Sequence, residues 1–185
     1  MSWEAIAGFS SVVIAVCALG LTVWQAATTR RHNRLSVTPH LTTWTQSEQA
    51  TGRYSVEILN NGIGPALIKS FSVQVDGQPI GGEGSEPIEK ALKVLFPQYS
   101  FHSSQAYMAR GYMMSAKEAR SLVAVQFFGE RFPRQEEVDH AMKRTRLLIE
   151  YESIYGDKQL LDTDALRSNP VLNTAARQPS LPRTG

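Results

Sequence analysis

The longest apolar stretch of the chain lies near its amino terminus. No charged residue occurs between Ala5 and Thr29, so a helix formed by this stretch is apolar on every face. About 20 such residues cross the roughly 30 Å hydrocarbon core of a bilayer. Trp3 and Trp24 bracket the stretch at about this spacing, and tryptophan favours the membrane interface. The pattern predicts a transmembrane anchor over residues 1–29.

The charges around this stretch predict its orientation. The preceding segment, MSWE, carries an acid, whereas Arg30, Arg31 and Arg34 follow the stretch directly. A cleaved signal peptide has a basic start and a shorter apolar region, so we expect the helix to be retained. Lys and Arg beside a span remain in the cytoplasm. We therefore expect the amino terminus outside, a basic juxtamembrane linker over residues 30–36, and the rest of the chain inside.

Small side chains recur near one stripe of the expected helix. The stripe contains Ala7, Ser11, Ala15, Ala18 and Thr22. Small residues allow helix backbones to approach closely in a bilayer. The lipid bilayer and a second copy of the chain are therefore both expected partners of this helix.

Beyond the linker, apolar and polar residues alternate with the period of β-strands. RYSVEILN places Tyr54, Val56 and Ile58 on one face. In LIKSFSVQVD the expected apolar face is Leu67, Phe71, Val73 and Val75. Further strands are expected over Val37–Gln46, near Ser100–Ser104, over Leu122–Phe128, and in RLLIEYESIY and QLLDT, which form a hairpin through Gly156–Lys158.

Two segments have helical spacing instead. They are PIEKALKVLF, from Pro87, and PRQEEVDHAMKRT, from Pro133. About seven strands in series with short connections favour antiparallel sheets. The predicted fold is mainly β: a transmembrane helix, then an antiparallel immunoglobulin-like β-sandwich over residues 37–165 with two short inserted helices. Residues 166–185 lose periodicity and are expected to form a disordered tail.

The segment LNNGIGPALIKSF contains two glycines and a proline between apolar runs. A dinucleotide-binding loop requires G-x-G-x-x-G leading into a helix, and a Walker loop ends in Gly-Lys-Ser/Thr. Here a strand follows instead, so we interpret Asn61, Gly62, Gly64 and Pro65 as a structural turn. The Asn and Gly residues are expected to supply the positive backbone angles of a reversal.

Composition and motifs give little indication of chemistry. Lys and Arg number 19 against 17 Asp and Glu, a balance that does not suggest nucleic acid as a partner. The four histidines are scattered and the one cysteine, Cys17, lies in the apolar stretch. The chain has no G-x-S-x-G motif. We therefore expect no catalytic residue, no metal ligand and no cofactor.

The anchor, the segment LNNGIGPALIKSF with its following VDG, and the closing IEYESIYGDK together resemble a diffuse set of uncharacterised bacterial single-pass membrane proteins. The resemblance covers roughly residues 5–163 in layout. It implies a location in the bacterial inner membrane, and it transfers no catalytic residue.

These observations favour a membrane-anchored, non-enzymatic binding or scaffold module whose β-sandwich is displayed at the cytoplasmic face. Its expected partner is another membrane or membrane-proximal protein. Two alternatives remain open: a periplasm-facing envelope or transport accessory protein, and an enzyme or ligand-triggered effector with an unrecognised site.

Overall fold

The computed structural model describes residues 3–168, which divide after Thr38 into two compact units. The first unit consists mainly of α1 (Trp3–Leu35), a single helix of 33 residues. It is long and apolar enough to span a membrane. The helix continues through Arg30–Arg34, so the basic linker expected from the sequence is helical up to Leu35. The second unit, residues 39–168, is called the body below.

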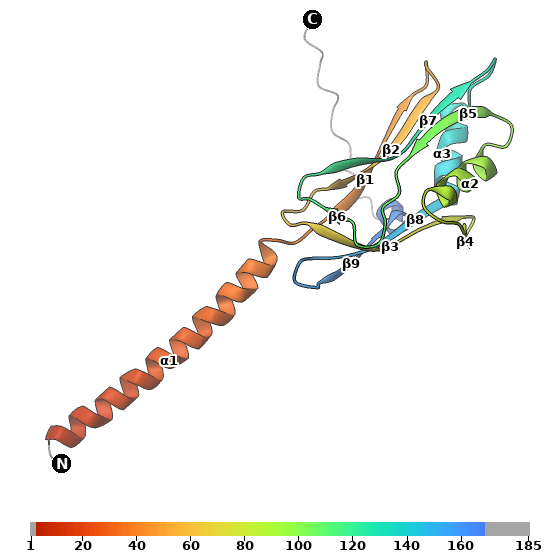
Figure 1. Ribbon diagram of the computed structural model, residues 1–185. Helices are drawn as coiled ribbons and strands as arrows, with labels where there is room; N and C mark the ends of the chain where they lie inside the picture. The colour runs from red at the N-terminus through yellow and green to blue at the C-terminus, as the bar shows by residue number, and fades with distance from the viewer. Residues whose placement is uncertain (1–2, 169–185) are drawn as a thin grey trace, which may run out of the picture. The chain divides into compact units, whose positions relative to one another are not determined.

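The body contains two antiparallel sheets (Figure 1). The first has the order β1-β2-β7-β5, with strands β1 (Leu41–Glu48), β2 (Arg53–Asn60), β7 (Ala119–Phe128) and β5 (Ser100–Gln105). The second has the order β4-β3-β8-β9, with strands β4 (Gln78–Pro79), β3 (Ala66–Val75), β8 (Thr145–Glu152) and β9 (Lys158–Asp162). The short β6 (Met113–Met114) pairs with the start of β3.

The core is formed by the apolar residues of both sheets and by the buried faces of the helices. Phe127 of β7 is its aromatic centre, with edge-to-face contacts to Tyr54, Phe96, Tyr99 and Phe101. The helices are α2 (Glu86–Leu95), α3 (Gln135–Arg144) and α4 (Thr163–Ser168). Burial of large aromatic rings in such edge-on geometry contributes strongly to a core of this size.

Most predicted elements are confirmed, and the overall class is corrected. The described chain is mixed rather than mainly β, with long helical segments beside nine strands. Both inserted helices are present, and β8 and β9 form the predicted hairpin. Three short elements are not predicted by the sequence: α4, and β4 and β6, which have only two residues each.

Two expected boundaries were wrong for local reasons. The first strand begins at Leu41 rather than Val37, because α1 extends to Leu35 and a turn follows it. Residues 166–168 were assigned to the tail, but they complete α4. The remainder of the expected tail lies outside the described residues.

The predicted apolar face of β3 is wrong at its first position. The pairing of β3 with β8 shifts between Ile68 and Ser70. A bulge reverses which side chains face the core. Ile68 is therefore fully buried in place of Leu67, whereas Val73 and Val75 face inward as predicted.

Candidate functional site

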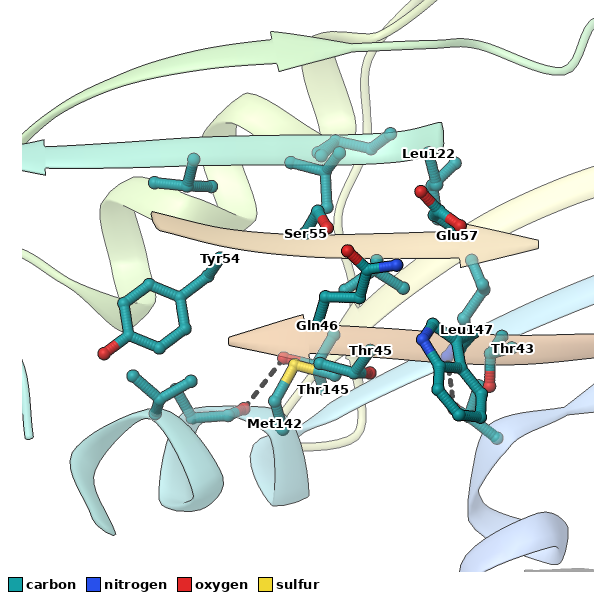
Figure 2. A pocket seen from close by; sticks show the side chains of 18 of the residues that line it. Thr43, Thr45, Gln46, Tyr54, Ser55, Glu57, Leu122, Met142, Thr145 and Leu147 are labelled. Carbon is teal, nitrogen blue, oxygen red and sulfur yellow. Dashed lines mark hydrogen bonds between the residues drawn. The ribbon is translucent and has the colours of Figure 1, made fainter. Parts of the chain in front are cut away.

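A cleft with a volume of about 1370 Å³ opens into the body beside the edge strand β1. Its apolar lining comes from both sheets and from α2 and includes Val56, Val73, Leu92, Leu122 and Leu147. Figure 2 shows labelled side chains of β1 and β2 close to those of α3 and β8, among them Thr43, Thr45, Tyr54, Met142 and Thr145. The cleft is larger than a typical small-molecule pocket and mostly apolar.

The sequence of β1 explains why the cleft is open on this side. Thr43 and Thr45 lie opposite Ile58 and Val56 of β2, so they share the inward face of the sheet. Thr43 is half-buried and Thr45 is exposed, whereas Ile58 is fully buried. Threonine tolerates contact with water, so the inner face of β1 does not need an apolar cover.

α4 forms part of the wall of the cleft, through Thr163, Leu166 and Arg167. The Arg167 guanidinium donates to the Thr145 carbonyl over 2.9 Å and to Asp164 Oδ1 over 3.0 Å. The Thr163 hydroxyl accepts from the Leu147 N–H over 2.9 Å. These bonds fasten both ends of the short helix to β8. Burial lowers the pKa of Arg167, which Asp164 partly opposes, but an arginine remains charged at any ordinary pH.

The backbone of β1 presents unpaired groups along the cleft. The Asn61 N–H donates to the His40 carbonyl over 2.7 Å, and opposite residues in antiparallel strands alternate between bonded and non-bonded pairs. Continuing this alternation along the unbroken register of β1 with β2 turns the N–H and C=O groups of Thr43, Thr45 and Ser47 toward the free edge.

This edge lacks the features that usually prevent strand addition. Exposed edges are commonly protected by proline, lysine or a bulge. β1 pairs with β2 over its whole length without a shift in register. It contains neither proline nor lysine, and Glu48 is its one charged residue. At the start of the strand, the Leu41 N–H is satisfied by the Tyr151 hydroxyl of β8 over 3.2 Å.

Asn60, the last residue of β2, organises the connection to β3. Its side chain is fully buried, and Oδ1 accepts from the N–H groups of His40 and Gly62, both over 3.1 Å. Its Nδ2 donates to three carbonyls, those of Gly64 (2.8 Å), Ser115 (3.1 Å) and Met114 (3.3 Å). One amide therefore links the start of β1, the β2–β3 connection and the end of β6.

The predicted turn residues Asn61, Gly62, Gly64 and Pro65 lie in this connection, but their expected geometry is wrong. Among the residues that the structure describes, positive φ angles occur elsewhere, for example at Asp76 and Gly77, and not at Asn60, Asn61 or Gly62. The connection crosses from one sheet to the other instead of closing a hairpin. A crossover needs a different backbone path from a tight reversal, and the buried Asn60 amide fixes that path.

The predicted anchor residues lie on α1. Trp3 and Trp24 have exposed fractions of 82% and 68%, and Arg30, Arg31 and Arg34 occupy the carboxyl-terminal part of the helix. The Thr22 hydroxyl donates to the Ala18 carbonyl over 2.8 Å, which satisfies this polar group within the helix. Cys17 is also on α1.

The titratable side chains of the body form structural pairs. The Tyr112 hydroxyl donates to Glu118 Oε1 over 2.6 Å and accepts from Arg120. This hydrogen bond from Tyr112 is the main reason that the pKa of Glu118 is lowered, while burial raises the pKa of Tyr112. Glu137 caps α3 by accepting from the Arg134 N–H, and it also accepts from the Tyr99 hydroxyl.

The histidines are dispersed, as the sequence indicates. His102 stacks on Phe128 with ring centroids 4.7 Å apart, and His32, His40 and His140 are exposed. Within residues 3–168, no group of three His, Cys, Asp or Glu side chains could hold a metal ion. The cleft and the edge of β1 are therefore the best-defined candidate site within residues 3–168.

Comparison with known proteins does not assign the chain to a family. No protein-family model matches the chain, and no curated protein matches it. The likeness to bacterial single-pass membrane proteins therefore rests on layout alone.

Proposed function

We propose that this protein is a membrane-anchored, non-enzymatic binding module whose body lies at the cytoplasmic face of a bacterial inner membrane. The observation that carries the proposal is the open edge of β1 beside an apolar cleft, in a chain that also has a helix able to span a membrane. The arginines that follow the apolar stretch support the orientation.

We further propose that the body is an immunoglobulin-like sandwich. The order β1-β2-β7-β5 corresponds to strands A-B-E-D of that fold, and β4-β3-β8-β9 corresponds to C′-C-F-G. In this correspondence α2 replaces the link from C′ to D, and α3 replaces the link from E to F.

The proposed partner is an extended segment of another membrane or membrane-proximal protein. Such a segment adds a strand to β1, so that its backbone bonds to the free edge and alternate side chains enter the cleft. The apolar lining of the cleft favours apolar side chains at those alternate positions. Anchoring both partners to one membrane raises their effective concentration, so that the contacts of one added strand are enough for binding.

Thr45→Pro is expected to abolish partner binding while the body stays folded. Proline removes the Thr45 N–H, which faces the free edge, and it leaves the ladder between β1 and β2 intact. The measurement is crosslinking in intact cells from a photoreactive residue placed at Gln46, an exposed residue that lines the cleft. Thr45→Val is the matched control, because it keeps the N–H and the branched side chain. Equal crosslinking by both variants would rule out strand addition.

A reporter that is active only after export is expected to stay inactive when it is fused after Ser168. A reporter that is active only in the cytoplasm is expected to be active at the same fusion site. The fusion belongs after Ser168 because α4 ends at that residue. Replacing Arg30, Arg31 and Arg34 together by Gln removes the orienting charges and is expected to increase the exported fraction. An active exported reporter on the unaltered chain would favour the periplasm-facing alternative.

A further inference from the structure

One end of the body exposes apolar side chains at the tips of its connections. Ile63, between β2 and β3, is 59% exposed, and Met113 of β6 is 52% exposed. Ile154 and Tyr155, in the turn between β8 and β9, are 53% and 49% exposed. Four large apolar side chains on three segments are more than a scatter of single exposed residues.

The pairing of the strands places these tips at the same end. Leu67 of β3 lies opposite both Met113 and Glu152, and Glu152 lies opposite Lys158 across the β8–β9 turn. The connection that carries Ile63 immediately precedes β3. In Figure 1 the β2–β3 connection, β6 and the β8–β9 turn lie together at one end of the sheets. We call this the loop end.

The charges of the loop end favour contact with an anionic surface. Lys117 is exposed, and its ammonium group donates to the Asn61 carbonyl over 2.8 Å. Arg110 and Lys158 are also exposed.

Three acidic side chains of the loop end form an ion pair or accept a hydrogen bond. Glu152 pairs with Lys69 over 2.8 Å, Glu118 accepts from Tyr112, and Asp157 accepts from the Ser153 hydroxyl. At this end Lys69, Arg110, Lys117, Arg120 and Lys158 outnumber Glu118, Glu152 and Asp157 by two, and a basic excess favours contact with anionic lipids.

The chain itself limits how far the loop end can be from the anchor. His40 belongs to the loop end, because its carbonyl accepts from Asn61. Only Ser36, Val37 and Thr38 separate the end of α1 from Pro39. These three residues form a turn that continues from the helix, with the Thr38 N–H donating to the Leu35 carbonyl over 3.4 Å. The loop end is therefore the end of the body at which the chain enters from the anchor.

We propose that the loop end is a second membrane contact, whose tips insert into the headgroup layer of an anionic bilayer. This inference rests on the proposed anchoring by α1. Apolar tips buried there exclude water from isoleucine, methionine and tyrosine side chains, while the surrounding Lys and Arg groups meet lipid phosphates. The contact fixes the orientation of the body and leaves the edge of β1 accessible from the side.

The experiment places a polarity-sensitive fluorophore on single cysteines of the full chain, in which Cys17 is replaced by Ser. The chain is reconstituted in vesicles of equal parts phosphatidylethanolamine and phosphatidylglycerol, with a nitroxide quencher on the upper acyl chain. The test positions are Ile63→Cys and Ile154→Cys. Ala50→Cys, in the exposed turn between β1 and β2 at the other end of the body, is the matched control. Val13→Cys reports on the anchor.

Labels at 63 and 154 are expected to shift to shorter wavelength and to lose roughly half of their emission to the quencher, because interfacial apolar groups lie about 5–10 Å deep. The label at 50 is expected to be unaffected. If the label at 13 is quenched but those at 63 and 154 behave like the label at 50, the loop-end contact is wrong and the proposed anchoring stands. If the label at 13 is itself unquenched, the anchoring fails and this inference falls with it.

Discussion

Replacing Asn60 by alanine is expected to lower the free energy of unfolding of the body by about 3–4 kcal/mol. The substitution removes all five hydrogen bonds of a fully buried amide. It leaves the buried Gly62 N–H and the buried Gly64 and Met114 carbonyls without that partner, and each buried polar group left unsatisfied costs about 1–3 kcal/mol. Water that enters the new space recovers part of this loss, so the expected total is less than the simple sum.

The measurement is urea denaturation of the full chain in detergent micelles, followed by tryptophan fluorescence. Trp44 of β1 is the body's one tryptophan, since Trp3 and Trp24 lie on α1. Asn61→Ala is the matched control, because this neighbour is exposed and its amide makes a single side-chain bond, to Thr42 Oγ1 over 2.7 Å. We expect the control to cost about 0.5–1 kcal/mol at most.

A second substitution at the same position separates size from hydrogen bonding. Asn60→Asp keeps the shape of the side chain but turns a carboxylate oxygen toward the carbonyls of Gly64, Met114 and Ser115. At neutral pH it is expected to destabilise the body at least as much as alanine does, because the charge is buried and its second oxygen faces carbonyl oxygens with no donor. If Asn60→Ala and Asn61→Ala unfold at the same urea concentration, Asn60 does not organise this end of the body.

Introducing two aspartates into the middle of α1 is expected to release the protein from membranes. Val16 and Leu19 are exposed on the helix, at 64% and 66%, and each aspartate at the centre of a span costs roughly 2.5–3.5 kcal/mol of insertion free energy. Together the changes cost about 5–7 kcal/mol, enough to prevent stable insertion. After an alkaline carbonate wash, the unaltered protein is expected in the membrane pellet and the Val16→Asp, Leu19→Asp variant in the supernatant.

Exchanging the same two residues provides the control. Val16→Leu with Leu19→Val preserves composition and hydrophobicity, so this variant is expected to remain in the pellet. Recovery of the unaltered protein in the wash would contradict the anchor, and so would a double-aspartate variant that resists extraction.

Local patterns were sufficient for most elements of the body. Alternation in RYSVEILN and RLLIEYESIY predicts β2 and β8 because each strand buries one face. Proline followed by apolar residues at helical spacing predicts α2 and α3. The bulge between Ile68 and Ser70 could not be predicted in this way, since a register shift is a property of two paired strands rather than of one.

The candidate site was not visible in the sequence. LTTWTQSE reads as an ordinary strand, and nothing in it indicates that β1 lies at an edge or borders a cleft. The cleft lining comes from segments as distant as Val56 and Leu147, which no spacing rule connects. The sequence also gives no sign that Asn60, the last residue of an alternating strand, has a buried side chain that joins three segments.

The sequence by itself determined the features that depend on neighbouring residues: an uncharged stretch long enough to span a bilayer, the arginines that follow this stretch, and the periods of most strands and helices. Hydrophobic periodicity depends only on residues close together in the chain, so one sequence is enough to reveal it. Tertiary structure alone decided which strands share a sheet, that the β2–β3 connection crosses between sheets, and where the cleft and the loop end form. These features depend on contacts between residues far apart in the chain, whose energies are set by packing rather than by local order.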